Sequence, residues 1–408
     1  MSACGHEKDL ISIDEAIQSI LNTAKKLSTE TIFVKNSLSR YLSAPVYSPV
    51  NLPGFDQSAV DGYALCTSHA DAQHQSYVLM GEIRAGVASD LALQEGQAIR
   101  IFTGGKLPQG TTTIARQEIV EVVSDTQIRI TDPLMAHTDI RRRGEELAEG
   151  QSLAEAGQFI NIGSLAALSM AGVQTISVFR QPKVAVVITG DEIALDQNSL
   201  SEAQVFDANG PLLKAWFQQN AIQAEIIHVS DQSQAVTACF EQLKSKYDLI
   251  ITTGGVSVGD YDFVRPSSFD AGFEQIFWKV KQKPGKPLYF AQYQNPEHHC
   301  YLLGLPGNPA AVYVCMQVYG KLLIDALQGQ QPKTDTWFTA KLTHGMKEDK
   351  RERFIRMQAS IVKGELKVSS LAKQQSHMLS NLMQANCLVR IPAEVKPEAE
   401  MLVSGLFI

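Results

Sequence analysis

Cysteine is scarce in this chain, and no two cysteines are close together in the sequence. The six cysteines are scattered from Cys4 to Cys387, with no Cys-x-x-Cys pair and no histidine at the spacing of a metal ligand. The pattern therefore predicts neither a zinc site nor a disulfide framework. Reduced thiols in a cytoplasm are the simpler interpretation.

Long hydrophobic runs and an excess of positive charge are also lacking. No segment approaches the roughly 20 apolar residues that a membrane span requires, and Glu7, Lys8 and Asp9 stand where a signal peptide needs an apolar run. The net charge of −7 argues against a general nucleic-acid binder but allows a local basic pocket for an anion. We expect a cytoplasmic protein with neither membrane nor nucleic acid as a partner.

The chain has enough apolar material for several cores. It has 408 residues, of which 44% are hydrophobic and 19% are charged, as in ordinary folded proteins, and domains usually have about 100–200 residues. We expect four domains. They are a mixed N-terminal domain of residues 1–51 and 142–182, an inserted β-rich domain of residues 52–141, an α/β domain of residues 183–330 and a C-terminal β domain of residues 331–408.

The first half of the chain changes its hydrophobic period twice. An amphipathic helix is predicted at residues 13–27, with Ser12 as its N-cap and Glu15 at the capping-box position, followed by a second short helical stretch. The inserted region has short alternating stretches, at residues 98–102, 119–123 and 127–130, that predict strands. Residues 162–170 again have helical spacing, so the first helical region is expected to continue beyond the β insertion.

The clearest pattern begins at residue 183. A continuous apolar run at residues 184–188 is typical of a buried parallel strand. Further strands are predicted at residues 224–229, 249–251, 277–280 and 301–304, and helices at residues 211–219, 235–243 and 310–327. This alternation implies right-handed crossovers and a doubly wound α/β sheet. After residue 334, short strands and turns predict a compact β-barrel or sandwich.

Two strand ends of this sheet carry unusual loops, at the edge where α/β proteins bind ligands. Directly after residues 184–188 come Thr189, Gly190, Asp191 and Glu192. A hydroxyl, a glycine and two carboxylates suit a hydrated Mg²⁺ shared with a phosphate. An Asp-Glu pair at this position is also common at the start of a helix, so this pattern alone leaves both interpretations open.

The second loop, residues 252–262, reads Thr-Thr-Gly-Gly-Val-Ser-Val-Gly-Asp-Tyr-Asp. Glycines among hydroxyl residues can turn several backbone N–H groups toward an anion. The loop has neither the Lys-Ser/Thr ending of a Walker loop nor the spacing of a dinucleotide fold. Asp260 and Asp262 would add carboxylates to the same sheet edge, although a glycine-rich turn is commonly only a turn.

A cationic segment follows, with Lys279, Lys281, Lys283 and Lys286 around the string Pro-Gly-Lys-Pro. Lysines can guard an exposed strand edge, or they can capture an oxyanion such as phosphate or molybdate. The prolines favour the second interpretation, because they fix where the charges point. The turn at residues 304–309 has backbone donors that would face the same strand ends.

Other polar groups stand outside the α/β region. The string at residues 53–63 contains Asp56, Ser58 and Asp61, and a run of three arginines begins at Arg141. Such a run is usually a solvated or interface cluster, but arginines also grip phosphates in bidentate fashion. His377 has no visible partner, so a structural role is at least as plausible as a catalytic one.

The order of these strings along the chain is far more specific than any one of them. The chain resembles the molybdopterin molybdenumtransferase family, which includes MoeA and the homologous domain of gephyrin, over nearly its whole length. The matching strings are Phe55-Asp56-x-Ser58-Ala59-x-Asp61-Gly62-Tyr63-Ala64, Arg100-Ile101-x-Thr103-Gly104, Gln117-Glu118, Arg141-Arg142-Arg143-Gly144-Glu145, Thr189-Gly190-Asp191-Glu192, Thr253-Gly254-Gly255-Val256-Ser257-x-Gly259-x-x-Asp262, Lys283-Pro284-Gly285-Lys286-Pro287 and Gly304-Leu305-Pro306-Gly307-Asn308-Pro309.

The resemblance implies an elongated homodimer of four-domain subunits. Its active site would lie between the α/β domain of one subunit and the β-rich and C-terminal domains around the dimer interface. The implied enzyme takes adenylylated molybdopterin and molybdate, cleaves the pyrophosphate with Mg²⁺, and leaves molybdenum-bound molybdopterin and AMP. A molybdopterin adenylyltransferase would supply the substrate, and molybdoenzymes or their chaperones would take the product.

By matched position, the resemblance implies a catalytic group and a substrate-binding group. The catalytic group is Asp61, Thr103, Asp191, Glu192, Asp262, Lys279 and Lys283. Asp191, Glu192 and Asp262 would arrange the metal, and the lysines would bind molybdate or the pterin phosphate. Substrate contacts are expected at Thr189, Gly190, Gly254, Gly255, Ser257, Asp260, Lys286, Pro306, Arg141, Arg351, Arg356 and Ser376.

Four positions depart from the usual pattern of the family. Arg116 replaces an apolar residue, Ala208 replaces a serine, and Ala310 and Ala311 stand where the family often has Val-Ser. None of these changes removes a carboxylate or lysine of the expected site. Arg116 places a charge in a predicted strand, which leaves the packing of that strand open.

Three other functions remain possible on sequence. A molybdopterin adenylyltransferase or a nucleotide pyrophosphatase of the competence-damage-inducible type would share the Gly-Gly-Val-Ser loop, but neither is expected to carry the β-rich insertion and the C-terminal domain. A scaffold that has lost catalysis is the third possibility, and the intact carboxylates and lysines oppose it. The sequence does not distinguish molybdate from tungstate.

Overall fold

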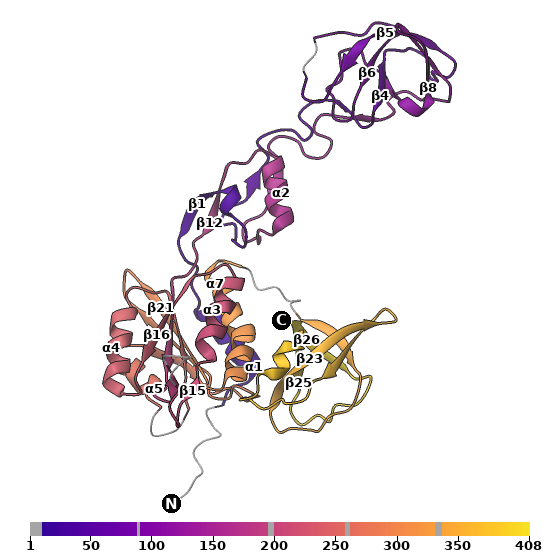
Figure 1. Cartoon of the computed structure of the whole chain (residues 1–408). Coiled ribbons are helices and arrows are strands. Elements are labelled where there is room, and N and C mark those ends of the chain that lie inside the picture. Colours follow the sequence, from indigo (N-terminus) through magenta and orange to yellow (C-terminus); the bar gives the residue numbers. More distant parts are fainter. Residues whose placement is uncertain (1–9, 88–89, 195–199, 258–261, 331–336) are drawn as a thin grey trace, which may run out of the picture. The chain divides into compact units, whose positions relative to one another are not determined.

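The computed structural model describes residues 10–87, 90–194, 200–257, 262–330 and 337–408. The chain forms two compact units (Figure 1). The larger unit contains the described parts of Met1–Glu30, Ser39–Tyr41 and Phe179–Ile408, and the smaller contains Thr31–Leu38 and Leu42–Val178.

A six-stranded sheet forms the centre of the larger unit. Its strands lie in the order β16 (Ala224–Val229), β13 (Val184–Thr189), β17 (Leu249–Thr253), β21 (His299–Leu305), β20 (Tyr289–Gln294) and β18 (Glu274–Trp278). The first four strands run parallel, and β20 runs antiparallel to both of its neighbours. The α/β prediction is therefore confirmed, but the sheet is mixed and β20 was not predicted.

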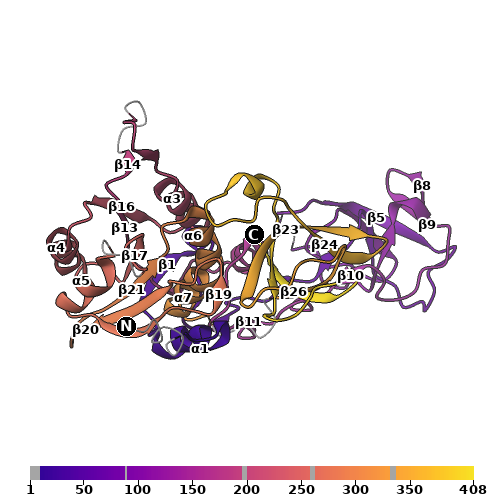
Figure 2. The same cartoon turned by 90° about the horizontal axis from the view of Figure 1, so that it is seen from below.

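Helices cover both faces of this sheet (Figure 2). One core joins Val184, Val186 and Ile188 to α1 (Ile13–Thr23), α3 (Asn209–Gln219) and the helix after β21. The other joins Ala185 and Val187 to α4 (Ser233–Leu243) and α5 (Val264–Asp270). Successive side chains of β13 point to opposite faces because a strand has a period of two, and this explains the uninterrupted apolar run in the sequence.

The helix after β21 is long and apolar. It consists of α6 (Pro309–Cys315), a π-helical segment η3 (Met316–Gly320) and α7 (Lys321–Leu327). Its mean hydropathy of 1.4 and its length would suit a membrane span, but 67% of it is buried inside the protein. Gln317, Lys321 and Asp325 interrupt the helix along one half-buried stripe, so it is not a run of roughly 20 apolar residues.

The first helix begins as predicted. The Ser12 hydroxyl accepts the Glu15 N–H at 3.1 Å and the Glu15 carboxylate accepts the Ser12 N–H at 2.7 Å, which is the predicted capping box. The helix ends at Thr23 rather than at residue 27, because the Leu27 N–H donates to the carbonyl of Leu327 in α7. The expected second helical stretch is instead β1 (Thr29–Phe33) and a short 3₁₀ turn, η1 (Val34–Asn36).

The C-terminal region is a closed β-barrel, as predicted. Its strands follow one another as β23 (Glu352–Val362), β24 (Glu365–Ser370), β22 (Phe338–Leu342), β26 (Leu402–Phe407) and β25 (Cys387–Ile391), and β25 pairs back with β23. A two-residue strand of the α/β region, β19 (Gln282–Lys283), joins β23 in parallel. A 3₁₀ turn, η4 (Ser380–Met383), precedes β25. Arg390 in β25 also forms a bidentate ion pair with Asp14 of α1 at 2.8 and 2.9 Å.

The smaller unit is built around a second six-stranded sheet. Its order is β7 (Thr113–Arg116), β4 (Gly62–Leu65), β6 (Gln97–Ile101), β5 (Ser76–Ile83), β9 (Gln127–Ile130) and β8 (Val120–Ser124), with the 3₁₀ turn η2 (Gln117–Ile119) before β8. The three strands predicted in this region correspond to β6, β8 and β9. Arg116 does not disturb β7, because its side chain is exposed and pairs with Asp139 at 2.7 and 2.9 Å.

The rest of the smaller unit is mixed. Helix α2 (Ile162–Met170) has the predicted bounds, and the Asn161 side chain caps it by accepting the Ser164 N–H at 2.9 Å. Short two-stranded ladders complete the region. They are β1 with β12 (Thr175–Phe179), β2 (Val46–Tyr47) with β11 (Ser152–Ala154), and β3 (Gln57–Ser58) with β10 (Ile140–Arg141).

Candidate functional site

The strand order reverses direction at the carboxyl ends of β13 and β17, which is where α/β sheets have their ligand-binding crevice. From β13 the chain crosses to β16 on one side, and it then returns to β17 on the other side of β13. Loops that leave two neighbouring strands in opposite directions open a crevice between them, where α/β sheets bind their ligands. The loops that begin at Thr189 and Gly254 flank this point.

Three loops meet at this sheet edge. The Thr189 hydroxyl donates to the Thr253 carbonyl at 3.2 Å, and the Gly254 N–H donates to the Leu305 carbonyl at 3.1 Å. A side chain on Gly254 would place its Cβ 3.0 Å from the Thr189 hydroxyl, and the φ of +86° also favours glycine here. A Cβ on Gly307 would lie 3.5 Å from the Cα of Gly254. The structure thus brings Thr189, Gly254 and the turn that contains Pro306 together.

Carboxylates gather on the first loop. The Asp191 carboxylate accepts the Asp231 N–H at 3.2 Å. The Glu192 carboxylate folds back over Gly190, where a Cβ would come within 2.7 Å of it. Burial, followed by the negative charges of Glu192 and Asp191, raises the pKa of Asp231. The alternative that the Asp-Glu pair starts a helix is wrong, because β14 (Ile193–Ala194) follows and pairs with β15 (Val205–Phe206).

Asp231 was missed by the sequence analysis. It follows the predicted strand at residues 224–229, so its place after a third strand end was a signal that could have identified it. Among the residues that the structure describes, no three Asp, Glu, His or Cys side chains form a cluster suited to a metal. Asp260 lies outside the described residues, while Ser257 and Asp262 stand on either side of that gap.

At the start of α3, where Ala208 replaces the usual serine, another side chain caps the helix. The Asp207 carboxylate accepts the N–H groups of Asn209 and Gly210, each at 2.9 Å, so it caps the helix in place of the usual serine. The Asn209 side chain donates to the Gly307 carbonyl at 2.9 Å. This end of α3 therefore holds the third of the three loops. Ala310 and Ala311 are buried in α6.

The four lysines of the cationic segment have different environments. Lys279 is only 6% exposed and its ammonium lies 3.7 Å from the centre of the Trp278 ring. A buried lysine does not guard a strand edge, so that interpretation does not hold for Lys279. Lys281, Lys283 and Lys286 are exposed, and Lys283 forms an ion pair with Asp349 at 2.8 Å.

The C-terminal barrel contributes a loop to the same region. The N–H of Ala310, at the start of α6, donates to the Ser376 carbonyl at 3.1 Å. Arg351 lies beside the cationic segment, where its guanidinium donates to the Gln282 carbonyl at 3.4 Å. Arg356 is 1% exposed, and its guanidinium donates to carbonyls of the loop that carries Ser376. Its contacts hold this loop in place. His377, in the same loop, is exposed.

The smaller unit holds the remaining predicted residues. The Asp61 carboxylate accepts both the N–H and the hydroxyl of Thr103, at 2.8 and 2.7 Å, and the Thr103 N–H lowers the pKa of Asp61. Arg141 is exposed in β10. The predicted site residues are therefore divided between the two units, and within the smaller unit the structure brings Asp61 and Thr103 into direct contact.

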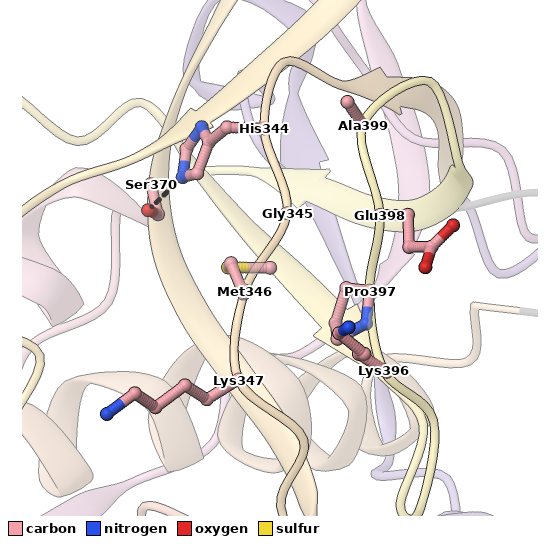
Figure 3. A pocket seen from close by; sticks show the side chains of 9 residues that line it. All are labelled: His344, Gly345, Met346, Lys347, Ser370, Lys396, Pro397, Glu398 and Ala399. Atoms are coloured by element: carbon pink, nitrogen blue, oxygen red, sulfur yellow. Dashed lines mark hydrogen bonds between the residues drawn. The ribbon is translucent and has the colours of Figure 1, made fainter.

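A separate depression of about 640 Å³ lies in the C-terminal barrel (Figure 3). The side chains of His344 and Ser370 are hydrogen-bonded on one side of it, at 2.7 Å, and Glu398 lies across from them. None of the predicted site residues lines it.

Comparison with known proteins agrees with this architecture. Three family models match in order, described as the MoeA N-terminal region (domain I and II) at residues 11–172, a probable molybdopterin binding domain at residues 185–326, and the MoeA C-terminal region (domain IV) at residues 339–400. The molybdopterin biosynthesis MoeA protein from Pyrococcus horikoshii has the same fold, with a TM-score of 0.81 at 21% identity over 98% of this chain and 100% of that chain.

Two relatives are similar over nearly their whole length. The molybdopterin molybdenumtransferase of Haemophilus influenzae is 31% identical over 395 residues, which cover 94% of this chain and 95% of that protein. The molybdopterin molybdenumtransferase of Staphylococcus aureus is 28% identical over 394 residues, which cover 95% of this chain and 92% of that protein. The chain is an enzyme that belongs to the molybdopterin molybdenumtransferase family.

Proposed function

We propose that this enzyme converts adenylylated molybdopterin and molybdate into molybdenum-bound molybdopterin and AMP. The observation that carries the proposal is the meeting of the three loops after β13, β17 and β21, with Asp191 and Glu192 on the first and the cationic segment nearby. The names of the relatives support molybdenum transfer to molybdopterin.

The chemistry that we propose is cleavage of a phosphoanhydride by water. The bond between the two phosphates breaks, AMP leaves, and molybdopterin keeps its own phosphate. Such a reaction depends mainly on charge neutralisation and in-line positioning. The Thr189 hydroxyl and the loop N–H groups would orient the pyrophosphate, and Lys279, Lys283 and Lys286 would bind molybdate or the pterin phosphate.

Asp191 and Glu192 would hold the magnesium ion, together with Asp262. The pair is compatible with Mg²⁺, which is usually held by one or two carboxylates, several waters and substrate phosphates rather than by a protein cage. Asp231 lies beside this pair, since its N–H donates to the Asp191 carboxylate, and a cation there would relieve the repulsion among the three carboxylates. A bound Mg²⁺ would neutralise charge on the cleaved phosphates.

The other predicted residues complete the proposal. Asp61, Thr103 and Arg141 would act from the β-rich region, and Arg351 and Ser376 from the barrel. We also propose a homodimer with the four domains given above and a cytoplasmic location. An adenylyltransferase would supply the substrate, and molybdoenzymes or their chaperones would receive the product.

The test is AMP release from adenylylated molybdopterin, with molybdate and Mg²⁺ present or omitted, on wild type and Glu192→Gln. Glu297→Gln, at the opposite edge of the same sheet, is the matched control. We expect molybdate-dependent release that collapses only in Glu192→Gln. Release without molybdate would indicate a nucleotide pyrophosphatase, and tight binding without release would indicate a scaffold. An adenylylated or phosphorylated protein in mass spectrometry would contradict direct attack by water.

A further inference from the structure

Trp278 lies at the sheet edge that carries the proposed site. It is the last residue of β18 and is paired with Tyr289, which is paired in turn with Gly304 and so, through β21, with Thr252. Thr252 and Gly304 in this row lie one residue before the carboxyl ends of β17 and β21, whose following loops meet there. Trp278 therefore stands beside these loops and is only half-buried.

The indole of Trp278 holds the glycine-rich loop by its backbone. Its Nε1–H donates to the Val256 carbonyl at 2.9 Å. Val256 follows Gly255 directly, and its side chain is 1% exposed. It packs so closely on the sheet that a Cβ on Gly304 would lie 2.7 Å from it. The hydrogen bond therefore fixes the backbone of a loop that is already seated on the strand ends.

The same indole also holds a lysine of the cationic segment. The Lys279 ammonium lies 3.7 Å from the centre of the ring, and the Arg265 guanidinium lies 4.3 Å from it. A cation over an indole ring is attracted by the negative face of the ring, most strongly where water is excluded. Lys279 is 6% exposed and has a φ of +72°, so its backbone is also held in an uncommon conformation.

We propose that Trp278 is a positioning residue of the anion site, because its one side chain holds both the Val256 carbonyl and the Lys279 ammonium in position. The inference rests on the proposed function in one respect, that Lys279 binds the anionic substrate. Trp278 itself does not touch the reacting atoms in this proposal. It keeps the loop N–H groups and the lysine in a fixed mutual arrangement, so that an anion meets a site that needs no reorganisation.

Calorimetric titration of the full chain with sodium molybdate tests the proposal. Trp278→Leu removes both contacts and is expected to weaken binding roughly tenfold. Trp278→Phe keeps a ring for Lys279 but loses the N–H, so it should restore part of the affinity. Trp337→Phe is the matched control, since Trp337 stacks on Phe354 of the barrel, with ring centres 6.1 Å apart, and it should bind as wild type does.

Tryptophan emission gives a second measurement of the same binding. Molybdate should alter the emission of wild type and of Trp337→Phe in a saturable way, at concentrations that match the calorimetric affinity. Partial recovery of affinity from Trp278→Leu to Trp278→Phe is the result that separates the ring from the N–H. Wild-type affinity in Trp278→Leu and Trp278→Phe would overturn the inference and leave the proposed function standing. Wild type that binds no molybdate would overturn both.

Discussion

Lys283 of the cationic segment and Asp349 of the C-terminal barrel form an ion pair, with 2.8 Å between Nζ and Oδ2. The pair lies where β19 joins β23, so the segment is held to the barrel by both backbone and charge. The hydrogen bond from Lys283 is the main reason why the pKa of Asp349 is lowered. An anion that binds Lys283 must therefore compete with a carboxylate of the same molecule.

Removing that competitor should strengthen anion binding. We expect Asp349→Asn to increase molybdate affinity about threefold and Lys283→Gln to decrease it, in calorimetric titrations. The pair is half exposed, so its loss should cost at most about 1 kcal/mol of stability. Glu365→Gln, which breaks the exposed pair with Lys341 elsewhere on the barrel, is the control. Weaker binding by Asp349→Asn would show that Asp349 positions Lys283 rather than competing for it.

The buried guanidinium of Arg356 leads to a second prediction. It donates to the carbonyls of Met378, Lys373 and Gln375 at 2.6, 3.1 and 3.2 Å, and burial lowers its pKa. In Arg356→Met, buried carbonyls lose their donor, at a cost of about 1–3 kcal/mol each where water cannot replace it. We expect a loss of about 3 kcal/mol in unfolding free energy and faster hydrogen exchange at residues 373–378.

Two further variants separate this role from a loss of charge alone. Arg356→Lys keeps the charge but cannot reproduce the fork that reaches several carbonyls, so it should still lose much of the protection from exchange. Lys373→Ala removes an exposed side chain and keeps the carbonyl that Arg356 binds, and it should behave as wild type. Unchanged exchange in Arg356→Met would contradict the proposed role of Arg356 in holding the loop.

The features that could best be predicted are those determined by residues close together in the sequence. Helix α2 has the predicted bounds because Asn161 caps it within one turn, and Ser12 and Glu15 start α1 in the same way. The direction of β20 depends on a partner instead. The hairpin that joins it to β21 is too short for the crossover that a parallel pair needs, but residues 289–294 were not predicted to form a strand.

In the site, too, contacts that follow from strand order could be predicted, and contacts between residues far apart in the sequence could not. Loops after neighbouring parallel strands must meet, so the proximity of Thr189 and Gly254 could be predicted from strand order. The partners of Lys283 and Arg356 could not be predicted, because Asp349 is 66 residues from Lys283 and the carbonyls that bind Arg356 are 17 to 22 residues away. Arg356 was expected to contact the substrate by its matched position, and only the closed barrel shows that its side chain is buried.

The environment of Asp56 predicts a pH dependence in the smaller unit. Its carboxylate accepts the Arg143 N–H at 2.8 Å and the Arg142 guanidinium at 2.7 Å, and the Arg143 N–H is the main cause of its lowered pKa. Because the folded pKa lies below the ordinary value of 3.8, the unfolded chain takes up the proton first as the pH falls. The stabilisation by Asp56 is therefore present above that value and is lost as the pH falls through the folded pKa.

We expect Asp56→Asn to be less stable than wild type at neutral pH and to approach wild type in acid. Circular dichroism during urea unfolding at several pH values measures this difference. Asp125→Asn, in the exposed turn between β8 and β9, is the control for loss of a carboxylate. A difference between Asp56→Asn and wild type that stays constant with pH would contradict the assignment.

Gly62 in β4 packs against the backbone of β7 so closely that no side chain fits. A Cβ there would lie 2.0 Å from the Ala115 carbonyl oxygen, so Gly62→Ala must push two paired strands apart, at a cost of about 3 kcal/mol. Gly54→Ala is the control, since its Cβ would meet its nearest atom at 3.8 Å. All three tryptophans lie in the larger unit, so the unfolding transition measured by tryptophan emission should be the same in both variants. Amides of β4 and β7 should lose protection from hydrogen exchange in Gly62→Ala alone. Equal protection in the two variants would show that the sheet accommodates the methyl group.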